Sequence, residues 1–187
     1  MCYEIPKRIK TIKADKRMTN APFEFAYGDS LNPLDLLEEL AHGRHWLSER
    51  VNENLMYIQA AGKNSQYKLQ MEWDEEFNAL QLSVPLEDVR LKDEYLPAAA
   101  EIFMKINDTM WMGHFDLSSG ENRPTFRHTS MLHTVPSPIA VEMIADITEI
   151  AITECDRFYM TFKMLASGDI RSQEAFSIAM FRTAGEA

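Results

Sequence analysis

The chain has 187 residues, of which 45% are hydrophobic and 26% are charged, as in an ordinary globular protein. A domain of this size buries roughly two thirds of its unfolded surface, so it needs no disulfide or metal to be stable. The sequence has no run of about 18 apolar residues, and its basic N-terminus lacks the apolar core of a secretory signal. Neither a membrane span nor export is therefore predicted. The two cysteines, Cys2 and Cys155, have no metal-like spacing, which is typical of a cytoplasmic protein.

The charge is distributed unevenly along the chain. The net charge is −10, yet residues 1–30 carry six Lys or Arg and four acidic residues, so the remaining residues carry −12. An acidic body disfavours nucleic-acid binding and suits a basic or amphipathic protein partner. The sequence therefore predicts a basic N-terminal arm at 1–30, either disordered or a short amphipathic helix, and a single domain at 31–187. An arm for nucleic acid, with its charges at 7–17, is the alternative interpretation of this segment.

The first half of the domain predicts one helix and a run of strands. Asn32 is suited to cap a helix over 31–43, with Pro33 at its first position, where the missing N–H costs nothing. Residues 66–73 alternate between apolar and polar, which is typical of an antiparallel strand with one solvated face. Strands are expected at 46–51, 55–60, 66–73 and 80–84.

The second half predicts a helix, a hairpin and a long helix. A helix over 93–111 has one apolar seam, which could dock on the sheet or on a second copy of the chain. A hairpin follows over 113–132, then a helix over 137–165 and a last amphipathic helix from Ser172. The fold class expected is α+β, with an antiparallel β-sheet packed against helices in the order α-β-β-β-α-β-β-α. The segment 80–84 adds a strand to this order.

The common catalytic motifs are missing from the sequence: a Gly-rich phosphate loop, GxSxG, HExxH and CxxC. The best enzymatic candidates are His114, Asp116, His128 and His133 in the hairpin, because histidine and carboxylate groups can bind a metal or transfer a proton. The alternative is structural: half-buried histidines bonded to a backbone group or a carboxylate, and Asp116 paired with Arg127 across the hairpin.

Other reactive or adaptable residues also have two interpretations. Cys155 could be a reactive thiol, but its place in the apolar stripe of the long helix favours a small buried group. Seven of the twelve methionines could line an adaptable protein-binding surface or could fill the core. These are Met71, Met104, Met110, Met112, Met131, Met160 and Met164.

Four segments resemble a known family. NPLD at 32–35, WMGHFDL at 111–117, FRH at 126–128 and TECDRFY at 153–159 are similar to the YbjN-domain family of bacteria, in its alphaproteobacterial branch. The resemblance covers about 31–187, and the final Gly-Glu-Ala fits it as well. The segment at 111–117 is specific as a family label, but the family has no established active site to transfer to this chain.

The resemblance implies a fold similar to type III secretion chaperones, which are small, acidic, often dimeric proteins that bind partner segments. The family is described in terms of sensory transduction or stress response. We therefore expect a non-enzymatic, chaperone-like or regulatory protein, without a cofactor, that forms a homodimer and binds a protein or peptide. The expected contacts are Trp111, Met112, Phe115, Phe126 and His128. A small metal-dependent or acid–base enzyme and a nucleic-acid regulator remain the alternatives.

Overall fold

The computed structural model describes residues 32–169, apart from 45, 119, 133–134 and 136. The basic arm at 1–30 and the last helix expected from Ser172 lie outside these described residues, as does His133. No helix in the part of the chain that the structure describes combines the length and the apolar character needed to cross a membrane.

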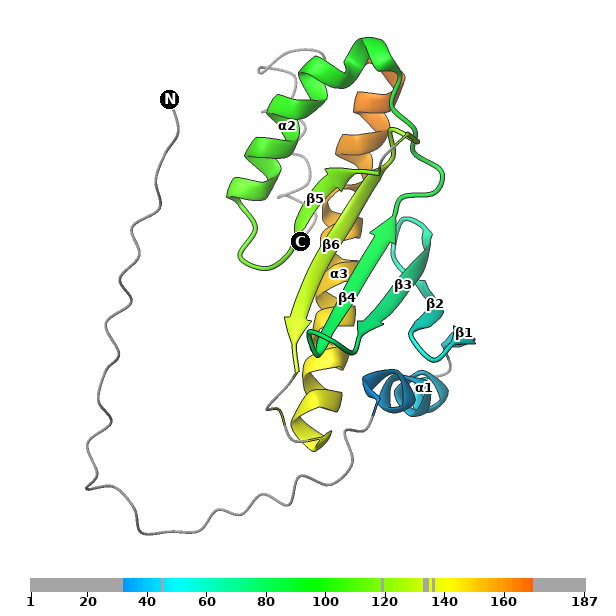
Figure 1. Cartoon of the computed structure of the whole chain (residues 1–187). Helices are drawn as coiled ribbons and strands as arrows, with labels where there is room; N and C mark the ends of the chain where they lie inside the picture. Colours follow the sequence, from blue (N-terminus) through cyan, green and yellow to red (C-terminus); the bar gives the residue numbers. More distant parts are fainter. Residues whose placement is uncertain (1–31, 45, 119, 133–134, 136, 170–187) are drawn as a thin grey trace, which may run out of the picture. The chain divides into compact units, whose positions relative to one another are not determined.

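Six antiparallel strands form one sheet in the order β1-β2-β3-β4-β6-β5 (Figure 1). This arrangement confirms the predicted α+β fold, including the additional strand before the second helix. The sheet is not a simple meander, because the chain leaves β4, passes through a helix, and returns at the far edge as β5. The strands are β1 Leu47–Asn52, β2 Leu55–Ala61, β3 Gln66–Asp74, β4 Ala79–Pro85, β5 His114–Leu117 and β6 Pro124–Met131.

Three α-helices accompany the sheet: α1 Pro33–Gly43, α2 Leu96–Asp108 and α3 Ser137–Ser167. The predicted cap of α1 is confirmed, since the Asn32 side chain accepts a hydrogen bond from Leu34 N at 2.9 Å. The predicted helix over 93–111 is longer at both ends than the observed helix α2. A 3₁₀ turn at Asp93–Tyr95 precedes α2, and Thr109 caps its C-terminus, so the chain leaves the helix before Trp111.

The three helices lie on one face of the sheet, and the residues of β2, β3 and β4 that point to the other face are more exposed. In Figure 1, α3 lies along that covered face, with α1 near β1 to β3 and α2 near β5. Because side chains alternate along a strand, every second residue of β2, β3 and β4 is buried on this face. The stripe predicted for α3 is buried against it from Ile144 onward: Ile144, Ile147, Ala151, Cys155, Phe158, Phe162 and Leu165.

A cluster of five phenylalanines joins α2, β5, β6 and α3. Phe115 lies at its centre, with ring centroids 5.6 Å from Phe126, 5.8 Å from Phe158 and 4.9 Å from Phe162. Phe103 of α2 packs on Phe162 at 5.1 Å. Two of the contacts with Phe115 are edge-to-face, which is a favoured arrangement of aromatic pairs. The apolar seam of α2 is thus used within the chain and is not available as a dimer contact.

A carboxylate of α3 holds the β2–β3 turn. Asp156 accepts hydrogen bonds from Lys63 N at 2.7 Å, from Asn64 N at 3.0 Å and from the Tyr67 hydroxyl at 2.8 Å. Burial, and then the hydrogen bond to Asp156, raise the pKa of Tyr67 above its usual range. Gly62 is required beside this contact, because a Cβ there would lie 2.3 Å from the Tyr67 ring and 2.8 Å from the Asp156 carboxylate.

We expect Asp156→Ala to lower the free energy of unfolding by roughly 2–3 kcal/mol, because it removes three hydrogen bonds to one charged acceptor. Urea unfolding measures this change through the transition midpoint at an unchanged slope. Glu142→Ala, at an exposed site of the same helix, is the matched control and should change stability by less than about 0.5 kcal/mol. Equal stabilities of the two variants would contradict the role assigned to Asp156.

Candidate functional site

The corner between α2 and β5 is fixed by a side chain that acts as a strand partner. The Asn107 amide accepts a hydrogen bond from Phe115 N at 2.8 Å and donates one to Phe115 O at 3.0 Å. This pair satisfies both backbone groups of Phe115 on one side of β5, which lies at the edge of the sheet. The start of β5 is therefore bound to the last turn of α2, with seven residues of chain between Asn107 and Phe115.

Gly113 allows the chain to turn tightly above the core. Its φ of +70° lies in the left-handed region, which side chains rarely adopt. A Cβ at this position would lie 2.3 Å from the Phe126 ring and 3.0 Å from Arg127 O. Residue 113 therefore needs glycine both for its backbone conformation and for the close approach of β6.

The hairpin separates the histidines that sequence analysis placed in one cluster. His114 is opposite Arg127 in the ladder, and neighbouring residues of a strand point to opposite faces, so His128 lies on the other face from His114. Asp116 instead pairs with Arg127, with 2.8 Å between Oδ2 and Nε. This ion pair confirms the structural alternative for Asp116. Within the described residues, no group of three or more His, Cys, Asp or Glu side chains could hold a metal ion.

His128 is half-buried on the face covered by the helices. Its Nε2 lies 3.1 Å from the Ser130 hydroxyl oxygen. The hydrogen-bond partner is therefore a side-chain hydroxyl, where a backbone group or a carboxylate was expected. Burial, and then the charge of His114, hold the pKa of His128 below its ordinary value. The imidazole is therefore neutral at physiological pH, where it contributes a polar group without a charge.

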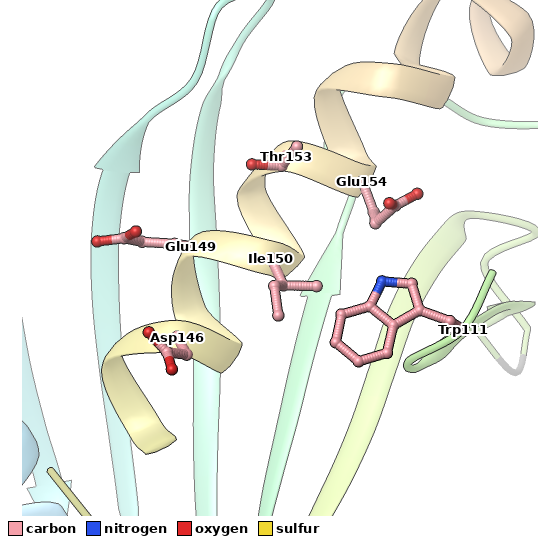
Figure 2. A pocket seen from close by; sticks show the side chains of 6 residues that line it. All are labelled: Trp111, Asp146, Glu149, Ile150, Thr153 and Glu154. Carbon is pink, nitrogen blue, oxygen red and sulfur yellow. The ribbon is translucent and has the colours of Figure 1, made fainter. Parts of the chain in front are cut away.

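A hollow of about 390 Å³ lies between the α2–β5 corner and α3. It is lined by one residue of the corner and five of the helix: Trp111, Asp146, Glu149, Ile150, Thr153 and Glu154. Figure 2 shows the indole of Trp111 standing beside α3, with Ile150 facing it and Glu154 above it. Trp111 is 79% exposed, the largest value among the exposed large apolar side chains of the described residues.

The three carboxylates of the hollow have different surroundings. Glu149 forms an ion pair with Arg44, which follows α1, and in Figure 2 its side chain points away from Trp111. Glu154 lies 3.3 Å from Arg157 and its side chain is only 13% exposed. Asp146 is exposed and makes no ion pair with another residue that the structure describes. The side of the hollow near Trp111 therefore combines an aromatic ring, an aliphatic side chain and carboxylate oxygens.

The five residues expected to contact a partner are divided between surface and core. Trp111 is exposed, and Met112 is partly buried against the core. Phe115 and Phe126 are 1% and 0% exposed, so they support the corner from beneath and offer no contact surface. The methionines follow both interpretations: Met104, Met131 and Met160 are exposed, whereas Met71, Met110, Met112 and Met164 are buried or packed against the core.

Cys155 is fully buried in the core, as its position in the α3 stripe predicts. Burial raises the pKa of its thiol well above the usual value, and the charges of Asp156 and Glu154 act in the same direction. A thiol in this state is a poor nucleophile. Cys155 therefore packs as a small apolar group.

Sequence analysis missed the residues that build the site around Trp111. The two hydrogen bonds between the Asn107 side chain and the backbone of Phe115 were not predicted. Asp146, Glu149 and Thr153 were not among the predicted site residues. The available signal was an amphipathic helix whose outer face carries acids together with Ile150, but nothing in the spacing says that Trp111 lies beside it.

A model of the YbjN family, described as "Putative bacterial sensory transduction regulator", matches residues 33–164. This span is more than two thirds of the chain, and it contains all six residues that line the hollow. No curated protein matches the sequence.

We expect Asn107→Ala to lower the free energy of unfolding by roughly 1–3 kcal/mol, because both backbone groups of Phe115 lose their partner. Asn107→Asp should cost at least as much, since it places a carboxylate oxygen against the Phe115 carbonyl. Asp108→Asn, at the exposed next residue of α2, should stay within about 0.5 kcal/mol of the parent chain. Chemical denaturation distinguishes these cases. An unchanged stability of Asn107→Ala would contradict the role assigned to its two hydrogen bonds with Phe115.

The depressed pKa of His128 makes the protein less stable in mild acid. The folded state disfavours the charged imidazole, so the unfolded state binds more protons and stability rises with pH. The stability that the neutral imidazole contributes is fully present above the ordinary histidine pKa. It is lost as the pH falls toward the lower pKa that His128 has in the folded state. We expect the urea midpoint to drop between about pH 7 and pH 5, and His128→Gln to reduce this slope. NMR titration should show His128 below its ordinary pKa, and a value at or above it would contradict the assignment.

Proposed function

Because the chain belongs to the YbjN family, we propose that it is a regulatory, chaperone-like protein that acts by binding another polypeptide and performs no chemistry of its own. The family description supports regulation in general. One observation carries the choice of polypeptide binding: Trp111 is 79% exposed beside a hollow, on a corner whose β5 end is held by the Asn107–Phe115 hydrogen bonds.

An exposed tryptophan at the rim of a hollow is well suited to binding a polypeptide. Tryptophan is among the residues most enriched at the centres of protein interfaces, because its ring buries a large area with few rotatable bonds. Leaving this ring in water has no stabilising effect on the fold. The other two tryptophans are used inside the molecule: Trp73 is 7% exposed in the core, and Trp46 packs against it.

The remaining predicted contacts support Trp111 from beneath. Phe115 and Phe126 fix the backbone on which the corner rests, and Met112 packs on the same core. His128 lies on the covered face of β6, where its imidazole is half-buried. A surface held in this way loses little conformational entropy on binding, which favours affinity.

A homodimer in the cytoplasm, with a fold similar to type III secretion chaperones, belongs to the same proposal. The observed element order and the acidic body support it. Since the α2 seam packs against α3, a dimer must use another surface, and Met104 on the outer side of α2 is 74% exposed. Light scattering of the full chain at several concentrations would measure the oligomer directly.

We expect proteins from the host lysate to be captured by the immobilised chain and lost with Trp111→Ala. Phe77→Ala is the matched control, because Phe77 is also a large apolar side chain, 61% exposed, in the β3–β4 turn. It should retain what the parent chain retains. Quantitative mass spectrometry of the three captures measures the difference. Capture that is absent, or equal with all three chains, would exclude binding through this surface.

A further inference from the structure

We propose that the hollow at Trp111 binds an arginine- or lysine-containing segment of the partner, with the cationic side chain placed between the indole and the carboxylates of α3. This inference rests on the proposed function and adds the chemistry of the partner. The occupant is a cationic polypeptide segment with an apolar neighbour for Ile150.

The indole of Trp111 is open to a cation. Aromatic rings attract cations over their faces, and tryptophan does so most strongly. Arg44 already lies over the ring of Trp46, with 5.5 Å from its guanidinium carbon to the ring centroid. In the part of the chain that the structure describes, no Lys or Arg is stacked on Trp111 in this way. A cation for this ring must come from elsewhere.

The carboxylates that line the hollow complement such a cation. Glu154 is placed above Trp111 in Figure 2, and Asp146 lies two turns earlier on α3. The ion pair of Glu154 with Arg157 uses Oε2 and leaves Oε1 for a second donor. Counting Arg44 and Arg157 against the three acids leaves the hollow with a net negative charge. Its partial burial makes this charge more effective than the same charge in open water.

The size and the remaining lining favour a segment of a polypeptide. A volume of about 390 Å³ is at the low end for ligand sites, so it suits one long side chain and part of its neighbour. Ile150 provides an apolar contact for that neighbour, and the Thr153 hydroxyl provides a neutral polar group. The charge of the whole domain acts in the same direction, because the residues after 30 carry −12 and attract cationic chains. Arginine should bind more tightly than lysine, since its planar guanidinium can stack on the ring and still donate hydrogen bonds to a carboxylate.

Tryptophan fluorescence tests this inference on the full chain. Acrylamide quenches the exposed indole of Trp111 most strongly, and it reaches the partly buried Trp46 and the 7%-exposed Trp73 less. The probe is the peptide GIRRIRG, and the matched probe has citrulline in place of arginine, which keeps the shape and removes the charge. We expect the arginine peptide to protect Trp111 from acrylamide. This protection should weaken as salt is added. The citrulline peptide should bind about tenfold more weakly or not at all. Trp111→Phe should remove the signal.

Two double variants separate the charge of the hollow from the charge of the domain. Asp146→Asn with Glu154→Gln should weaken the arginine peptide about tenfold, and a cooperative urea transition will show that the variant is still folded without the Glu154–Arg157 ion pair. Glu75→Gln with Glu76→Gln removes the same charge from the β3–β4 turn and should bind like the parent chain.

Three results would overturn the inference. Equal binding of the citrulline peptide, or full binding by the Asp146→Asn, Glu154→Gln chain, would exclude a cationic site. If lysate capture then still depended on Trp111, the proposed function would stand with a different partner chemistry. If Trp111 in the chain alone were shielded from acrylamide at low salt and exposed at high salt, the occupant would be this chain itself, either its own basic residues or a second copy.

Discussion

The site depends on Phe115, which is held by both its backbone and its side chain. Asn107 bonds its N–H and its C=O, while its ring packs on Phe126, Phe158 and Phe162. These contacts connect the end of α2, the edge strand β5, its neighbour β6 and the long helix α3. None of the four elements can move against the others without breaking an aromatic contact or exposing a backbone group. The β5 end of the corner that carries Trp111 is therefore fixed by the core.

The segment Trp111–Leu117 shows why a distinctive motif need not be an active site. Gly113 allows the turn, Phe115 fills the core and Asp116 pairs with Arg127. These roles place the backbone, and they require those residue types whatever the protein binds. The segment TECDRFY at 153–159 also has structural roles. Asp156 holds a turn, and Tyr159 donates a hydrogen bond to Asp88. Trp111 is the exception, since its ring contributes to no such contact in the described part of the chain.

Much of the fold follows from local patterns, whereas the site does not. Alternation along β3, the Asn32 cap and the apolar stripe of α3 each depend on residues close in sequence, and all three are present. The clamp of Asp156 joins residues about ninety positions apart, and no local pattern encodes such a pairing. Phe115 and Phe126 were expected to contact a partner, but the hairpin sequence alone does not tell which of its faces a helix covers. Both side chains lie in the core.

The rigidity of the corner bears on how a partner would be selected. A flexible loop can adapt to many partners but loses conformational entropy when it binds, whereas a loop whose backbone is held in place loses less. Around Trp111 the geometry is determined by the core, so partners can differ in affinity only through what they bring to the hollow. The aromatic face, Ile150 and the carboxylates of α3 together favour a long side chain that is apolar along its stem and positive at its end. Selectivity of this kind is set by charge, and it weakens with salt in a way that binding by apolar burial alone does not.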